Sequence, residues 1–153
     1  MTGGRIKRIE KYVGNETFML TYGDGVSNVD IQNLVDFHKN HGKFATLTAV
    51  QPIGKFGSIE INDNLIESFH EKPKGDGAWV NGGFFVLEPM IFRYIGNEED
   101  ATWERKPLEQ LANEKQLMAF HHEGFWRPMD TLRDRIDLEN IWNSDHCDWR
   151  LWK

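Results

Sequence analysis

Residues 18–25 read Phe-Met-Leu-Thr-Tyr-Gly-Asp-Gly, an apolar run that ends in a carboxylate between two glycines. The apolar part predicts a buried strand over Thr17–Tyr22. Because Gly23 and Gly25 have no Cβ, a phosphate, a metal or a ligand backbone can come close to Asp24. Hard cations such as Mg²⁺ prefer few protein carboxylates together with substrate phosphates. The segment therefore suits a metal site at a strand end, although by itself it suits an ordinary turn even better.

The residues that follow predict a helix and a second strand. Asp30 can cap a helix over Asp30–His41, and Gly42 can end it. The run Phe44–Val50 predicts a strand. A strand, a helix and a strand within about thirty residues indicate a parallel β-α-β unit.

The remainder of the chain continues this alternation. Asn62-Asp63-Asn64 predicts a three-residue hairpin turn between strands at Gly57–Ile61 and Leu65–Phe69. We expect further helices and strands at Arg5–Val13, Asn81–Leu87, Pro89–Tyr94, Pro107–Lys115, Leu117–His121 and Leu132–Trp142. The expected fold is a single α/β domain over residues 1–153, with a mainly parallel, doubly wound sheet and an antiparallel insertion.

Composition narrows the class of protein. The length of 153 residues suits one domain. A net charge of −6 argues against a protein that binds a nucleic-acid backbone. No run of 18 apolar residues is present, and the first five residues contain no apolar signal-peptide core. Cys147 is the single cysteine, so no internal disulfide can form, and we expect a cytoplasmic protein.

Four further segments contain residues that suit a binding site. Phe56-Gly57 fits a turn at a strand entry, and the two lysines of Glu71-Lys72-Pro73-Lys74-Gly75 can neutralise a phosphate or simply face solvent. The glycines of Asn81-Gly82-Gly83 fit close approach by a ligand or another strand, or a β-bulge. In Phe125–Thr131, Asp130 can cap the next helix or act as a second metal carboxylate.

These five segments occur in one order, and in that order the chain resembles the sugar-phosphate nucleotidyltransferases. The resemblance is strongest to the glucose-1-phosphate cytidylyltransferases, through Asp76-Gly77, Asn81 and the run Trp126-Arg127-Pro128-Met129-Asp130-Thr131. It implies a Rossmann-like fold of the nucleotide-diphospho-sugar transferase type. It also implies Mg²⁺-dependent transfer of a cytidylyl group from CTP to glucose 1-phosphate, which yields CDP-glucose and pyrophosphate.

The resemblance also accounts for the start of the chain. Members of the family begin with a strand and a GGxGTR-type loop that holds the triphosphate, whereas this chain begins with Gly3-Gly4 and a predicted helix. We therefore expect an N-terminally truncated fragment, the C-terminal three-fifths of a nucleotidyltransferase domain, with weak or no activity alone. A sheet that lacks its first strands exposes an edge, so we expect a homo-oligomer or a complementing N-terminal segment.

The resemblance assigns roles to individual residues. Asp24 and Asp130 are expected to bind Mg²⁺, and Lys72 to contact the phosphate of glucose 1-phosphate. Lys74 is a weaker candidate for that phosphate contact, and Asp24, Asp130 and Lys72 are the expected catalytic residues. The other expected substrate-binding residues are Glu71 on the sugar hydroxyls, Gly57, Asn81 and Gly82 around the sugar, Thr2, Gly3 and Arg5 near the cytosine or ribose, and Gly23 beside the nucleotide.

Two other functions are compatible with the sequence. One is a non-catalytic module that binds a sugar phosphate or a sugar nucleotide. The other is a metal-dependent glycosyltransferase, which the Glu71-Lys72-Pro73 run disfavours because it suits a sugar phosphate better than a neutral acceptor. His38 and His41 lie three residues apart on a helix, a spacing that could suit a metal, but no carboxylate or third ligand is spaced to join them, so we expect a core or surface role.

Overall fold

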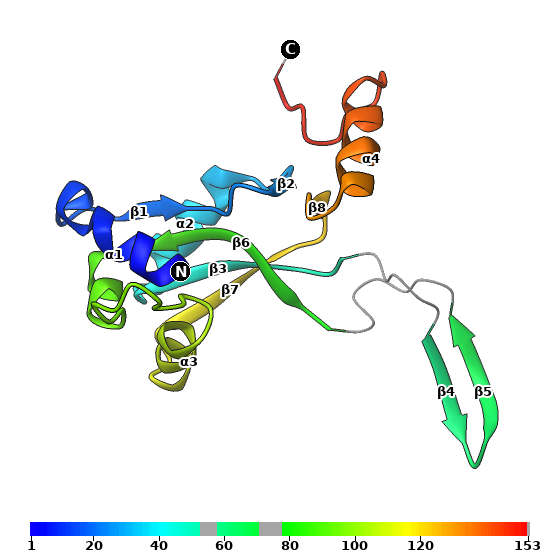
Figure 1. Cartoon of the computed structure of the whole chain (residues 1–153), viewed down its shortest axis with the longest axis horizontal. Helices are drawn as coiled ribbons and strands as arrows, with labels where there is room; N and C mark the ends of the chain where they lie inside the picture. The colour runs from blue at the N-terminus through cyan, green and yellow to red at the C-terminus, as the bar shows by residue number, and fades with distance from the viewer. Residues whose placement is uncertain (53–57, 71–77, 153) are drawn as a thin grey trace. The chain divides into compact units, whose positions relative to one another are not determined.

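The structure is a computed structural model that describes residues 1–52, 58–70 and 78–152, with only the backbone of 58–61 (Figure 1). Its helices are α1 (Thr2–Val13), α2 (Ile31–His41), α3 (Lys106–Asn113) and α4 (Leu132–Trp142), with the 3-10 helix η2 (Pro89–Arg93). Its strands are β1 (Phe18–Leu20), β2 (Gly25–Ser27), β3 (Ala45–Val50), β4 (Ser58–Asn62), β5 (Leu65–His70), β6 (Val80–Leu87), β7 (Leu117–His122) and β8 (Trp126–Pro128).

The chain forms two compact units. The first comprises residues 1–23, 30–48 and 83–120, and the second comprises residues 24–29, 49–82 and 121–153. No helix in the described part of the chain is long and apolar enough to span a membrane.

A four-stranded sheet with the order β1-β6-β3-β7 runs through the fold (Figure 1). β1 pairs antiparallel with β6. β3 also runs opposite to β6, because Glu88 N–H donates to the Phe44 carbonyl at 2.8 Å and the Thr48 hydroxyl donates to the Phe84 carbonyl at 2.9 Å. The expected α/β fold is confirmed. The sheet is mixed rather than mainly parallel, because β6 runs antiparallel to both of its neighbours, β1 and β3.

The first unit contains a continuous apolar core. Trp103 is fully buried and meets Phe85 edge-on, with 5.9 Å between ring centroids. Phe18 of β1 stacks on Phe92 of η2 at 5.4 Å. These contacts pack η2 and the segment after it against the sheet, in a cluster of Ile6, Ala45, Phe85, Leu87, Ile91, Phe92, Ile95, Trp103, Leu108 and Leu111.

Two local predictions have clear outcomes. The Asp30 carboxylate accepts a hydrogen bond from Asn33 N–H at 2.9 Å, and Gly42 ends α2 at φ 63°, so both expected ends of this helix are confirmed.

The predicted hairpin turn was one residue too long. Asn62 pairs with Leu65, which leaves a two-residue turn whose residues Asp63 and Asn64 have φ values of 43° and 72°. Positive φ at both positions is typical of a type I′ turn, which matches the twist of the strands.

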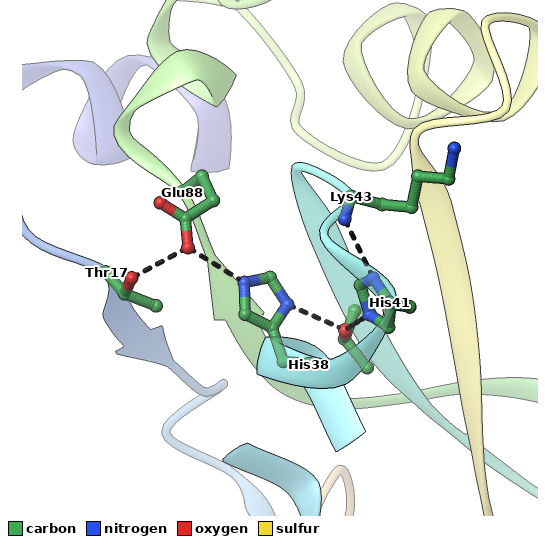
Figure 2. Close-up of polar contacts among 6 residues, drawn as sticks. Thr17, His38, His41, Lys43 and Glu88 are labelled. Carbon is green, nitrogen blue, oxygen red and sulfur yellow. Dashed lines mark hydrogen bonds and ion pairs between the residues drawn. The ribbon is translucent and has the colours of Figure 1, made fainter. Parts of the chain in front are cut away.

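His38 and His41 form part of a buried hydrogen-bond chain in the first unit (Figure 2). Lys43 N–H donates to His41 Nδ1 at 2.9 Å, so a neutral His41 has its proton on Nε2 and donates to Thr46 Oγ1 at 2.7 Å. The Thr46 hydroxyl can then donate to His38 Nδ1 at 2.8 Å, and His38 Nε2–H to Glu88 Oε1 at 3.1 Å. His38 is buried, as a core role requires, but the expectation that no carboxylate joins the histidines was wrong, because Glu88 reaches His38 from the end of β6.

The hydrogen bonds of His41 predict that the protein loses stability in mild acid. Burial first, and the nearby charges of His38 and Lys43 second, lower the pKa of His41 below its usual 6.5. The unfolded chain therefore binds more protons just below pH 6.5, and the stability present above that pH is lost as pH falls towards the folded pKa. We expect the urea midpoint to fall between pH 7 and pH 5.5. In a His41→Asn variant, the amide can still accept from Lys43 N–H, and the urea midpoint is expected to fall less between pH 7 and pH 5.5. A fall equal to that of the wild type would show that His41 does not cause the pH dependence.

Candidate metal and substrate site

Two short strands of the second unit bring the predicted metal carboxylates to the same end of a ladder. β2 pairs antiparallel with β8, with Gly25 opposite Pro128 and Ser27 opposite Trp126. One further hydrogen bond extends this ladder, from Met129 N–H to the Asp24 carbonyl at 2.8 Å. Asp24 therefore lies across from Met129, one residue from Asp130. The backbone thus brings the two acids close together although they lie far apart in the sequence.

The carboxylate of Asp130 does not cap the following helix. Thr131 is the N-cap of α4, and its hydroxyl accepts a hydrogen bond from Asp134 N–H at 3.2 Å. The Asp134 carboxylate accepts in return from Thr131 N–H at 2.9 Å, which completes a capping box. The capping alternative for Asp130 was wrong. Asp24 and Asp130 are both exposed, and neither carboxylate bonds to a residue that the structure describes.

The pair of carboxylates suits Mg²⁺ better than a metal that needs a full set of protein ligands. Among the described residues, no three His, Cys, Asp or Glu side chains are grouped so that they could hold a metal. Mg²⁺ retains several waters and is commonly bound by one or two carboxylates plus substrate phosphates. Two solvent-facing carboxylates on adjacent backbone segments fit that requirement, whereas a structural zinc site would need four ligands.

The segment Asn81-Gly82-Gly83 makes two close contacts. The indole N–H of Trp126 donates to the Gly82 carbonyl at 2.8 Å, which ties the start of β6 to β8. Gly83 has φ 87°, and a Cβ added there would overlap the ring of Tyr22. At Gly83, the group that comes close to the backbone is therefore the ring of Tyr22. Asn81 is half-buried and remains a predicted sugar contact.

The predicted nucleotide contacts near the N-terminus lie in the first unit, where they also have packing roles. The Thr2 hydroxyl donates to Glu104 at 2.6 Å and accepts from Trp103 N–H at 3.1 Å. A Cβ on Gly3 would lie 2.9 Å from the Ala101 carbonyl oxygen, so only glycine fits there. Arg5 is exposed and remains a predicted nucleotide contact.

The other predicted site residues divide into two groups. A Cβ on Gly23 would meet no described atom within 4 Å, which leaves space for the expected nucleotide. Gly57, Glu71, Lys72 and Lys74 lie outside the described residues, so their roles remain predictions.

Sequence reasoning missed the ladder that assembles this site. β2 and β8 are each three residues long, too short for an alternating pattern to reveal them. The cap was detectable in principle, because Thr131 and Asp134 have the spacing of a capping box. Trp126 was part of a recognised motif but had no predicted role, since nothing in the sequence shows which carbonyl its N–H will reach.

Comparison with known families gives a direct match. The pattern of the family described as "Nucleotidyl transferase" matches residues 3–142, which is most of the chain. The chain belongs to the nucleotidyl transferase family. This agrees with the resemblance found in the motifs, and it places the two acids within a transferase domain.

Individual nucleotidyl transferases give closer comparisons. The chain is 54% identical over 154 residues to the glucose-1-phosphate cytidylyltransferase of Salmonella typhimurium, covering 100% of this chain and 60% of that protein. It is 37% identical over 152 residues to a Bacillus subtilis protein named "Probable glucose-1-phosphate cytidylyltransferase", covering 99% and 59%. The chain thus spans about three-fifths of the length of these relatives.

A solved structure supports the fold. UTP-bound UGPase from Acinetobacter baumannii superposes with a TM-score of 0.67 at 13% identity, over 97% of this chain and 58% of that one. At this identity the similarity concerns the fold alone. The chain therefore shares the α/β fold of that protein.

Proposed function

We propose that this chain is the metal- and sugar-phosphate-binding part of a glucose-1-phosphate cytidylyltransferase. In the proposed reaction a phosphate oxygen of glucose 1-phosphate attacks the α-phosphorus of CTP. The bond between that phosphorus and the bridging oxygen breaks, so that CDP-glucose forms and pyrophosphate leaves. The observation that carries the proposal is the β2–β8 ladder, in which Asp24 lies opposite Met129, the residue before Asp130, in a chain 54% identical to an enzyme of that name.

Phosphoryl-type transfer depends mainly on positioning and on charge neutralisation, and needs no nucleophilic side chain. Asp24 and Asp130 would hold Mg²⁺, which when bound neutralises charge on the reacting phosphates. Lys72 would neutralise the phosphate of glucose 1-phosphate. Asn81 and Gly82 would orient the sugar, and Glu71 would accept hydrogen bonds from its hydroxyls.

The residues near the N-terminus would serve the nucleotide. Thr2, Gly3 and Arg5 would lie near the cytosine or ribose of CTP, and Gly23 would leave space beside it. As the C-terminal part of one transferase domain, the chain would act together with a segment that holds the triphosphate, or as a homo-oligomer. We further infer a cytoplasmic role in supplying CDP-glucose for polysaccharide synthesis, which fits the single cysteine.

The second candidate is a module that binds a sugar phosphate without turning it over. Such a module would bind the sugar phosphate through the same residues as the enzyme, but it would not activate a nucleoside triphosphate. It is the less favoured candidate, because the relatives named above are cytidylyltransferases by name. The glycosyltransferase alternative is less well supported, since the relatives named above are nucleotidyltransferases.

Two assays on the 153-residue chain test the proposal. We expect calorimetry to show Mg²⁺-dependent binding of glucose 1-phosphate. We also expect pyrophosphate release from CTP and glucose 1-phosphate to be about 10³-fold or more slower than with the Salmonella enzyme assayed in parallel, because basic groups on a transferring phosphoryl contribute that much. Absence of glucose 1-phosphate binding would contradict the proposed function. Turnover that equals the Salmonella enzyme would contradict the need for a separate triphosphate loop.

A further inference from the structure

Trp126 occupies a central place in the second unit that no predicted role explains. It lies on β8, opposite Ser27 of β2 and four residues before Asp130. Its indole N–H donates to the Gly82 carbonyl at 2.8 Å. A Cβ on Gly25 would lie 4.0 Å from the same nitrogen. The indole nitrogen therefore lies beside the residue that follows Asp24 and bonds to the residue that follows Asn81.

This arrangement connects two parts of the candidate site. Asp24 and Asp130 lie at one end of the β2–β8 ladder, whereas Asn81 and Gly82 are the second and third residues of β6. Among the described residues, the hydrogen bond from Trp126 to Gly82 joins β8 directly to the start of β6. Because the indole is rigid and half-buried, the bond restricts the distance between the two segments.

We propose that Trp126 is a positioning residue. It would hold the sugar-binding segment Asn81-Gly82 at a fixed distance from the proposed metal ligands Asp24 and Asp130. The inference rests on the proposed function, since it concerns the same site. Trp126 does not touch the reacting atoms. It acts through the Gly82 carbonyl, so that a sugar oriented by Asn81 presents its phosphate to the metal bound by the two acids.

The hydrogen bond and the volume of the ring can be separated. Benzothienylalanine has the shape of tryptophan with sulfur in place of the indole N–H, so at position 126 it removes the donor and keeps the packing. A Trp126→Phe variant removes the donor and part of the ring. Trp79→Phe is the matched control. The ring centroids of Trp79 and His121 lie 4.6 Å apart, and the indole N–H of Trp79 bonds to no described residue.

Calorimetry with glucose 1-phosphate and Mg²⁺, and separately with Mg²⁺ alone, tests the proposal. We expect benzothienylalanine at position 126 and Trp126→Phe each to weaken glucose 1-phosphate binding roughly tenfold, the effect of losing one well-placed hydrogen bond. Affinity for Mg²⁺ alone is expected to stay at the wild-type value, and Trp79→Phe to bind like the wild type. Glucose 1-phosphate affinity unchanged by benzothienylalanine would overturn the proposal, because packing alone would then suffice.

Amide hydrogen exchange distinguishes failure of this proposal from failure of the proposed function. If the wild-type chain does not bind glucose 1-phosphate, the proposed function fails. The positioning role is then decided by the exchange rates of Asn81, Gly82 and Gly83. Faster exchange in the benzothienylalanine protein than in the wild type supports a tie made by the indole N–H, and equal rates overturn it.

Discussion

Asp130→Asn and Asp24→Asn are each expected to weaken Mg²⁺ binding by roughly 100-fold, since loss of even an outer-sphere partner of a bound metal costs 10–100-fold. Each substitution removes one negative charge and one strong oxygen ligand and leaves the size of the side chain almost unchanged. Thr131 caps α4 in place of Asp130, so Asp130→Asn should leave the helix intact. Asp24 contributes only its backbone carbonyl to the ladder, so Asp24→Asn should leave that hydrogen bond in place.

Asp145→Asn is the matched control for both acid variants. Asp145 is an exposed carboxylate of the same unit, and its loss changes the net charge by the same amount. Calorimetric titration with Mg²⁺ should give wild-type affinity for the control and strongly reduced affinity for the other two. Equal affinity in all three variants would show that the metal binds elsewhere. A fall in the urea midpoint of Asp130→Asn would instead show that this carboxylate has a structural role.

Gly83→Ala is expected to destabilise the protein by about 3 kcal/mol, from two effects. A positive φ costs a residue with a Cβ about 1–2 kcal/mol, and Gly83 has φ 87°. The new methyl group would also overlap the ring of Tyr22, which meets Phe85 edge-on at 5.7 Å and must therefore move against the core.

Urea denaturation measures the effect of Gly83→Ala, with Gly23→Ala as its control. A Cβ on Gly23 meets no described atom within 4 Å, and its φ lies outside the positive range, so the control should change the free energy of unfolding by less than about 1 kcal/mol. An equally small effect of Gly83→Ala would mean that Tyr22 can relax without cost. The Tyr22 contact would then not explain the glycine.

Much of the fold could be predicted because the relevant signals are local. Asp30 and Gly42 mark the ends of α2, and the apolar runs at Phe18–Leu20 and Ala45–Val50 are strands of the sheet. The direction of β6 could not be predicted, because an apolar run shows burial but not the partner that it meets. The hairpin turn was misjudged because Asn and Asp readily adopt positive φ, which favours the shorter turn.

The site was predicted less completely, for a related reason. Asp24 and Asp130 were identified by resemblance to a family, and their proximity depends on a three-residue ladder with no sequence pattern of its own. The capping interpretation of Asp130 failed because Thr131 competes for the same helix end. The tie from Trp126 to Gly82 depends on tertiary structure, so residue types and spacing could not reveal it.

The central claim is that Asp24 and Asp130 together form the metal site of a nucleotidyl transferase. Crystals of the chain soaked in MnCl₂ test it most directly, because Mn²⁺ takes the oxygen ligands of Mg²⁺ and scatters X-rays anomalously. We predict an anomalous peak within coordination distance of both carboxylates, and its loss in Asp130→Asn crystals. A peak bound by other residues, or no peak at this ladder, would contradict the account.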